Sequence, residues 1–210
     1  MDISWLGHAC IRMRTSGAMI MMDPVDRESG YDMSRPTADI VTISCEVPSH
    51  SNERGIKGEF TVLNAPGEYE IRGVQFMGVA TRPPHVEGEP PGDRNTIFVV
   101  EADDLRVAHL GRLGWRLASD QAEHLGEVDI LLIPIGGAPG LDAAEAGRLV
   151  REIDPKVVIP MHYTPDANDL PPEDFIKAIG ATPEEPTNRV SIQRRGLGEN
   201  TRLVVLQPRG

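Results

Sequence analysis

Two histidines and one cysteine follow apolar segments that have the composition of buried strands. Cys45 and His50 come after residues 39–44, and His162 comes directly after residues 156–161. A strand that ends in a polar turn with a cysteine or a histidine is a natural place to hold a metal ion or a reacting group. Because both histidines lie in loops next to strands, we expect His50 and His162 to converge at one sheet edge.

The other histidines and one aspartate have simpler interpretations. We expect His8 and His109, which flank strand-like segments, to be packed and hydrogen-bonded rather than catalytic. His124 lies in a short predicted helix, where a surface position is expected. Asp23 ends a strand, and we expect its carboxylate to order residues 44–50 by accepting backbone hydrogen bonds.

Composition places the chain among globular proteins and excludes some partners. Of its 210 residues, 40% are hydrophobic and 25% are charged, which is ordinary for a globular domain. A net charge of −11 with no basic stripe argues against a nucleic-acid partner. The two cysteines form no disulfide framework, and neither a signal peptide nor an apolar run of roughly 18 residues is visible. We therefore expect a cytoplasmic protein with no membrane partner.

Periodicity predicts many strands early in the chain and helices only later. The expected strands are residues 3–13, 18–22, 39–44, 60–63, 69–71, 74–80, 95–101, 105–110, 128–135, 156–161, 190–193 and 201–207. The expected helices are residues 119–125 capped by Ser119, 142–153 capped by Asp142, and 172–179 closed by Gly180. Residues 82–93, rich in proline and glycine, are expected to form a loop. This order fits a two-sheet sandwich covered by helices, although periodicity alone indicates only a mixed α/β or α+β fold.

Several motifs occur in an order that resembles the metallo-β-lactamase superfamily, in its UlaG-like branch of Zn-dependent hydrolases. They are Trp5-Leu-Gly-His-Ala9, Met22-Asp-Pro24, Pro66-Gly-Glu-Tyr-Glu70, His109-Leu-Gly-Arg-Leu-Gly114, Ile133-Pro-Ile-Gly-Gly137 and Val158-Ile-Pro-Met-His162. The resemblance covers nearly the whole chain. It implies an α+β fold, a four-layer αββα sandwich formed by residues 1–210 as a single domain, with the site at one edge between the sheets.

The same resemblance identifies the positions at which the superfamily binds two metal ions. Its loop reads His-x-His-x-Asp-His after an apolar strand, and those four ligand positions correspond here to Cys45, Val47, Ser49 and His50. The position of the bridging aspartate corresponds to Arg112. Valine has no donor atom, and arginine is permanently protonated and cannot donate a lone pair. We therefore expect no metal cofactor, and a two-metal site is disfavoured.

Two functions remain open for this set of residues. In the first, the protein is not catalytic and Arg112, Ser49, His50 and His162 bind a small anionic ligand such as a carboxylate or phosphate. In the second, it is a hydrolase of esters or phosphodiesters with His50 and His162 as catalytic residues. That hydrolase would use a single zinc or manganese ion held by His50, His162 and either Cys45 or His85, or it would use a histidine as general base.

Cys45 and His85, the two candidates for a third metal ligand, also have simpler interpretations. Cys45 is more often an inert buried residue than a ligand. His85, in the proline- and glycine-rich loop, is expected to be exposed rather than bound to a metal. A homo-oligomer is compatible with either function.

Overall fold

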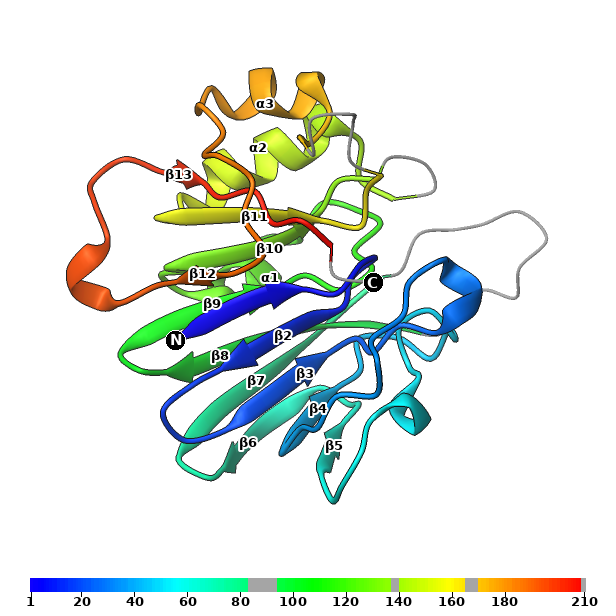
Figure 1. Cartoon of the computed structure of the whole chain (residues 1–210). Helices are drawn as coiled ribbons and strands as arrows, with labels where there is room; N and C mark the ends of the chain where they lie inside the picture. Colours follow the sequence, from blue (N-terminus) through cyan, green and yellow to red (C-terminus); the bar gives the residue numbers. More distant parts are fainter. Residues whose placement is uncertain (83–93, 137–139, 165–169, 209–210) are drawn as a thin grey trace.

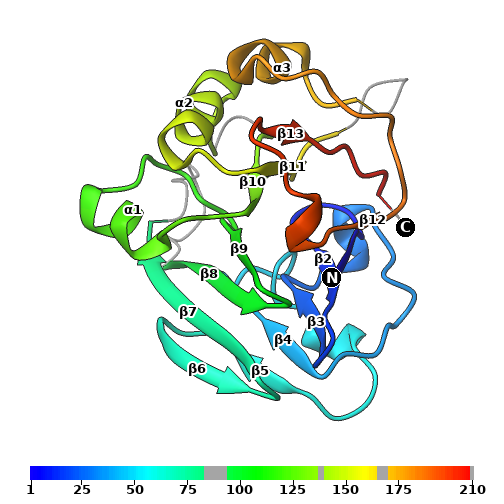
Figure 2. The same ribbon diagram turned by 90° about the vertical axis from the view of Figure 1, so that its left-hand side faces the viewer.

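The computed structural model describes residues 1–82, 94–136, 140–164 and 170–208. Two mixed β-sheets pack face to face, and three α-helices lie on the outer side of one of them (Figures 1 and 2). The expected α+β sandwich of the metallo-β-lactamase type is therefore confirmed.

The first sheet has six strands in the order β12-β1-β2-β3-β4-β5. These are β1 (Asp2–Trp5), β2 (Ile11–Arg14), β3 (Met19–Met22), β4 (Ile40–Thr42), β5 (Thr61–Leu63) and β12 (Val190–Ser191). Strands β3, β4 and β5 run parallel to one another, so their carboxyl ends meet at the same edge of the sheet.

The second sheet has seven strands in the order β13-β11-β10-β9-β8-β7-β6. These are β6 (Gly67–Ile71), β7 (Val74–Thr81), β8 (Asn95–Ala102), β9 (Leu105–His109), β10 (Ile130–Pro134), β11 (Val157–Met161) and β13 (Arg202–Leu203). Strands β9, β10, β11 and β13 are parallel. The last two strands of the chain are thus divided between the sheets.

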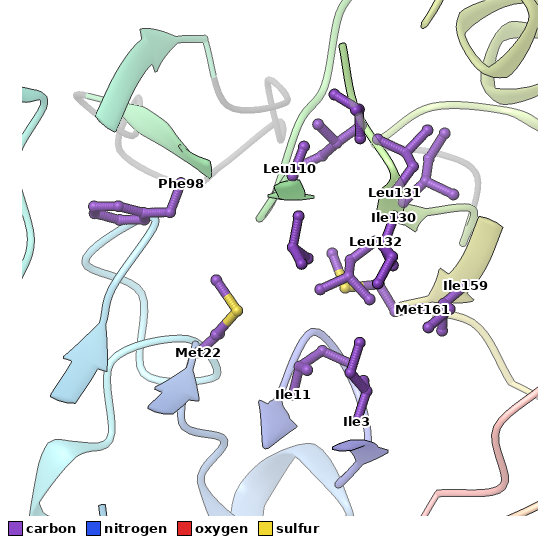
Figure 3. Packing of buried hydrophobic residues seen from close by; sticks show 14 of the residues in the cluster. Ile3, Ile11, Met22, Phe98, Leu110, Ile130, Leu131, Leu132, Ile159 and Met161 are labelled. Carbon is purple, nitrogen blue, oxygen red and sulfur yellow. The ribbon is translucent and has the colours of Figure 1, made fainter. Parts of the chain in front are cut away.

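The main core fills the space between the sheets. Ile3, Ile11 and Met22 point from the first sheet toward Leu110, Leu132 and Met161 of the second (Figure 3). Every residue of β10 and of β11 is buried, because the outer face of this part of the sheet is covered as well. Burial on both faces explains why these two segments are continuously apolar.

Three α-helices cover the second sheet: α1 (Ser119–Leu125), α2 (Ala143–Ile153) and α3 (Glu173–Ile179). Helix α2 buries Ala146, Leu149 and Val150, and its Gly147 lies against Ala178 of α3. The outer face of the first sheet is covered differently, by irregular segments with two short 3-10 helices, η1 (Arg27–Ser29) and η2 (Glu53–Gly55). Beneath them lies a second, smaller apolar core built on Met21 and Val41.

Most predicted elements are present within a few residues of their expected bounds, with one informative error. Residues 3–13 were expected to form one strand, but the structure breaks this segment into β1 and β2. The break is a tight turn in which Gly7 has φ 100° and His8 has φ 53°. Sequence periodicity missed this break because apolar residues continue through the turn.

The helix caps agree with the sequence-based expectations except at the start of α1. Asp142 caps α2 and Gly180 closes α3 in a left-handed conformation, as expected. The N-cap of α1 is Ala118 rather than Ser119. Among the described residues, no helix is both long and apolar enough to cross a membrane.

Candidate functional site

Three histidines from distant parts of the chain converge at the edge where the parallel strands end. His8 lies in the turn between β1 and β2, His50 lies in the loop after β4, and His162 directly follows β11. One ring nitrogen from each of them can be chosen so that these atoms lie within 4.8 Å of one another. The structure thus brings together His50 and His162, as the sequence indicated, and adds His8.

The three rings are in mutual contact. The ring centroids of His8 and His162 are 3.8 Å apart, and those of His8 and His50 are 4.8 Å apart. The centroids of His50 and His162 are separated by 5.5 Å. His8 is therefore the central member of the cluster.

Each of the three histidines has a buried ring nitrogen without a hydrogen-bond partner in the described part of the chain. These atoms are Nδ1 of His8, Nε2 of His50 and Nε2 of His162. The other nitrogen of His50, Nδ1, is 3.1 Å from the Ser49 hydroxyl oxygen. Because a buried polar atom without a partner is costly, three of them at one place indicate a ligand that they are built to hold.

The backbone fixes His8 and His162 against each other. The carbonyl oxygen of His8 accepts hydrogen bonds from the His162 backbone N–H at 2.7 Å and from the Trp5 indole at 2.8 Å. Both histidines have left-handed backbones, with φ 53° for His8 and φ 57° for His162. Such conformations cost free energy in residues other than glycine and are often kept at functional sites.

Burial keeps all three imidazoles neutral. Burial is the main cause that lowers the pKa of His8 to about 3, with smaller contributions from His162 and Arg112. Burial, with a smaller contribution from Arg112, also lowers the pKa of His162 to about 4. The pKa of His50 is also well below its ordinary value, mainly through burial and secondarily through the neighbouring histidines. Neutral imidazoles have a free lone pair, which is the form that binds metal ions.

Arg112 lies beside the cluster, at the position that the resemblance assigns to a bridging aspartate. It lines a small cavity of about 90 Å³ together with His8, Ser49 and His162. Its backbone N–H donates to Oδ1 of the buried Asn95 at 2.8 Å, and the Asn95 amide donates to the Leu110 carbonyl at 3.1 Å. The turn after β9 is therefore held in place by a satisfied buried amide.

Asp23 orders the loop after β4, as the sequence indicated. Its two carboxylate oxygens accept hydrogen bonds from the Ser44 backbone N–H at 2.7 Å and from the Ser44 hydroxyl at 2.6 Å. Ser44 in turn accepts from the Thr96 backbone N–H at 2.8 Å, which connects the two sheets beside the site. Burial raises the pKa of Asp23 to about 7.

The structure does not bring Cys45 into the histidine cluster. Its side chain is buried, and its Sγ lies 3.8 Å from the Ser44 hydroxyl oxygen, whose proton is donated to Asp23. Burial raises the pKa of its thiol to about 12, which opposes formation of a thiolate. The third imidazole is supplied by His8 instead, while His85 lies outside the described residues.

The remaining histidines lie apart from the cluster. His109 is fully buried, and its Nε2 is 2.9 Å from the Ala9 carbonyl oxygen, so it is packed and hydrogen-bonded as expected. His124 is exposed on α1. Sequence reasoning placed His8 in the same class as His109, and the one signal that separates them is Gly7, because a glycine inside a strand pattern can mark a break.

Comparisons with known proteins agree with this fold. The profile of the Beta-lactamase superfamily domain matches residues 2–162. A solved structure from Thermotoga maritima, assigned to the Zn-dependent hydrolases of the metallo-beta-lactamase superfamily, superposes with a TM-score of 0.77. That protein is 32% identical, and the match covers 98% of this chain and 99% of the other. The chain therefore belongs to the metallo-β-lactamase superfamily.

Within the superfamily, the chain is similar to proteins of the group named UPF0173. A UPF0173 protein of Pyrococcus abyssi is 28% identical, and the match covers 78% of this chain and 83% of the relative. A UPF0173 metal-dependent hydrolase of Methanopyrus kandleri is 25% identical, and the match covers 99% of this chain and 97% of the relative. The chain is thus similar along its length to proteins named as metal-dependent hydrolases.

The donor atoms fit one metal ion better than two. Three neutral imidazoles match a catalytic zinc site, which takes three protein ligands and keeps one position for water. Nitrogens around tetrahedral zinc are about 3.4 Å apart, and the three ring nitrogens here lie within 4.8 Å of one another, so the rings would move closer together to hold an ion. A second ion has no comparable donors among the described residues, because Val47 has none and Arg112 is a cation.

Proposed function

We propose that this protein is a metal-dependent hydrolase in which His8, His50 and His162 hold a single divalent ion, zinc or manganese. The observation that supports this proposal is the convergence of three imidazoles, each with one buried ring nitrogen that has no hydrogen-bond partner among the described residues. Similarity to metal-dependent hydrolases supports the reaction class. This proposal replaces the expectation that no metal binds.

The bound ion would supply a Lewis acid and lower the pKa of a coordinated water toward 7. The chain's own residues prepare this site before substrate arrives. Burial keeps the three imidazoles neutral, so no proton has to be displaced from them near pH 7. The hydroxyl of Ser49, at 3.1 Å from Nδ1 of His50, orients that ring, and the Nε2 of His50 has no partner among the described residues.

Arg112 has two opposing effects at this site. Its guanidinium repels a divalent ion, which weakens metal binding relative to a site with an aspartate at this position. The same guanidinium can form a charge-assisted pair with a carboxylate or phosphate group. We therefore propose that the substrate is a small anion, whose negative charge offsets the repulsion between Arg112 and the metal.

The second candidate function is binding of a small anion without turnover. The observation that favours it is that Arg112 lines the same cavity as His8, Ser49 and His162. In this case the histidines would hold the anion through their ring N–H groups, and Arg112 would supply the charge.

Hydrolysis assays distinguish the two candidates. We expect the zinc- or manganese-loaded protein to hydrolyse carboxylated or phosphorylated test esters, and we expect a chelator or His162→Ala to abolish that activity. Arg112→Met should raise KM for anionic esters more than for a neutral ester of the same alcohol, because only the anion pairs with Arg112. His124→Ala, on the surface of α1, serves as the control and should behave as the wild type.

Two outcomes would contradict the hydrolase proposal. Hydrolysis that is unchanged in His162→Ala would mean that the activity arises elsewhere. Saturable binding of a carboxylate or phosphate that is lost in Arg112→Met, without hydrolysis under any metal condition, would favour the second candidate.

A further inference from the structure

The cavity beside the histidine cluster has apolar as well as polar lining. Besides Arg112, Ser49 and two of the histidines, its lining comprises Leu113, Pro134, Gly136, Gly140 and Leu141. Leu113, Pro134 and Leu141, which we call the apolar wall, come from the second sheet and the segments that follow its strands. His8 and Ser49 come from segments of the first sheet. The cavity is therefore amphipathic.

The apolar wall is fixed by the core. Leu113 and Leu141 are each 1% exposed and belong to the main core, and Pro134 is the buried last residue of β10. Leu141 directly precedes Asp142, the N-cap of α2, and Leu113 directly follows Arg112 in the segment after β9. Because a strand, a helix cap and the core hold these side chains, the apolar wall keeps its shape before a ligand arrives.

Gly136 allows the chain to pass close to His162 at this cavity. A Cβ atom at position 136 would lie 2.1 Å from the His162 carbonyl oxygen and 3.1 Å from its Nδ1. The lack of a side chain thus lets the segment after β10 pack against this histidine. No side chain at position 136 competes with a ligand for the space beside the imidazole.

This combination of lining residues selects among anions. A carboxylate can pair with the Arg112 guanidinium through two parallel hydrogen bonds while its hydrocarbon portion lies on the apolar wall. Inorganic phosphate has oxygen atoms on every side, so some of them would lie against the apolar wall without hydrogen-bond partners, which is costly. The lining thus favours a carboxylate with an aliphatic group over a fully polar anion.

The volume of the cavity limits the size of this aliphatic group. The cavity has a volume of about 90 Å³, whereas an engineered apolar cavity that binds benzene has about 150 Å³. A carboxylate with a short alkyl chain fits the smaller volume, and an aromatic acid does not.

We propose that this cavity binds a short aliphatic carboxylate of about two to five carbons, with its carboxylate on Arg112 and its hydrocarbon on the apolar wall. This inference rests on the proposed function in one respect, the use of Arg112 as the anion-binding group, and it applies to both candidate functions. In the hydrolase, the short carboxylate is a substituent of the ester that reacts, and free carboxylates of this size bind in its place.

Equilibrium titration followed by NMR tests the proposal on the whole chain, before and after treatment with a chelator. The ligands are formate, acetate, propionate, butyrate, hexanoate, benzoate and phosphate at constant ionic strength and neutral pH. We expect affinity to rise about two- to fourfold with each carbon from acetate to butyrate, because each methylene leaves water. Hexanoate should gain nothing further, and benzoate and phosphate should bind more weakly than butyrate. Arg112→Met should weaken the binding of every carboxylate.

Leu141→Ala tests the apolar wall itself. This variant enlarges the cavity, so the preferred chain length should shift from butyrate to hexanoate. Leu125→Ala is the matched control, because Leu125 of α1 is equally buried but does not line the cavity, and it should keep the wild-type preference. The wild-type series alone tests the proposal if Leu141→Ala does not fold.

Three results would overturn the proposal: equal affinities of the wild type for formate, acetate and butyrate, tighter binding of phosphate than of butyrate, or an unchanged preference in Leu141→Ala. Zinc binding and ester hydrolysis without any carboxylate binding would also overturn it, while supporting the hydrolase proposal. The expected carboxylate series in a protein that neither binds zinc nor hydrolyses esters would support this inference and contradict the hydrolase proposal.

Discussion

His8 owes its place in the site to its backbone. It follows Gly7 in a turn that interrupts an apolar segment, and its left-handed conformation turns the imidazole toward His50 and His162. The His8 carbonyl accepts from both Trp5 and His162, so the turn is held by two hydrogen bonds at one atom. The free energy stored in such a conformation, about 1–3 kcal/mol per residue, must be recovered from these contacts.

Substitution of Gly7 tests whether this turn is required. Gly7 has φ +100°, and a Cβ atom there would lie 2.0 Å from the Tyr31 ring. We expect Gly7→Ala to lower the free energy of unfolding by about 2–4 kcal/mol, because backbone strain and a steric clash add together. Urea denaturation measures the change.

Gly58→Ala is the matched control for this prediction. Gly58 also has a positive φ, +90°, but a Cβ atom there would have no neighbour within 4 Å. Gly58→Ala should lower the free energy of unfolding through backbone strain alone, by about 1–2 kcal/mol. Equal losses in the two variants would show that the contact between Gly7 and Tyr31 contributes nothing.

The site could be predicted only in part at the level of single residues. The convergence of His50 and His162 follows from their positions after two apolar strands, and the structure has this geometry. His8 was not predicted, because its role depends on a turn that interrupts no hydrophobic pattern and that only Gly7 marks in the sequence. The exclusion of Cys45 from the cluster depends on its side-chain direction, which sequence spacing does not reveal.

At the level of elements, parallel strand ends create the site. Strands β4 and β11 belong to different sheets, yet the residues that follow them meet, because the two sheets present their carboxyl ends at the same edge. The hydrogen bond from Thr96 of β8 to the Ser44 carbonyl joins the sheets at this point. His8 and His162 are therefore held beside strand ends, and His50 is held by the loop after β4, which Asp23 orders through Ser44.

The N-terminal cap of α2 can be tested by mutation. The Asp142 side chain accepts from the Glu145 backbone N–H at 2.8 Å at the start of α2. We expect Asp142→Ala to lower the free energy of unfolding by about 1 kcal/mol through loss of this cap. Thermal or urea denaturation of the variant measures this effect.

Ser119→Ala is the comparison for the cap. Sequence reasoning assigned the cap of α1 to Ser119, but the structure places Ala118 at the N-cap and Ser119 inside the helix. We therefore expect little change in stability from this variant. A loss in Ser119→Ala as large as in Asp142→Ala would contradict the observed cap of α1.

The fold was more predictable than the site, because element types follow from periodicity over many residues. The buried strands β10 and β11 and the amphipathic α2 show this most clearly. The outer layer of the first sheet was less predictable. Its short helices η1 and η2 contain no buried residue, so they leave no hydrophobic pattern in the sequence.

For the whole molecule, buried histidines make stability depend on pH. The pKa values of His8, His50, His109 and His162 are all lowered, chiefly by burial, to about 3 for His8 and about 4 for His109 and His162. Below about pH 6.5 the unfolded chain therefore binds protons that the folded chain does not. We expect the free energy of unfolding of the metal-free protein to fall progressively from about pH 6.5 toward pH 4.

Asp23 acts in the opposite direction over part of this range. Because its folded pKa is raised to about 7, the folded state binds the additional proton, and Asp23 alone would make stability decrease as pH rises from about 4 to 7. Because four histidines oppose one aspartate, the free energy of unfolding should still increase as pH rises from about 4 to 7. Urea denaturation across this range checks the sign, and His109→Gln should make the slope shallower. A stability that rises on acidification would contradict the neutral state of the buried histidines.

Zinc stoichiometry tests the central claim most directly. Elemental analysis of the chelator-treated protein after reloading with zinc and removal of excess should give one zinc per chain for the wild type and for His124→Ala. His8→Ala should lose this zinc, because the cluster then keeps only two imidazoles. Absence of zinc in the reloaded wild type, or full zinc content in His8→Ala, would contradict a single-metal site built by His8, His50 and His162.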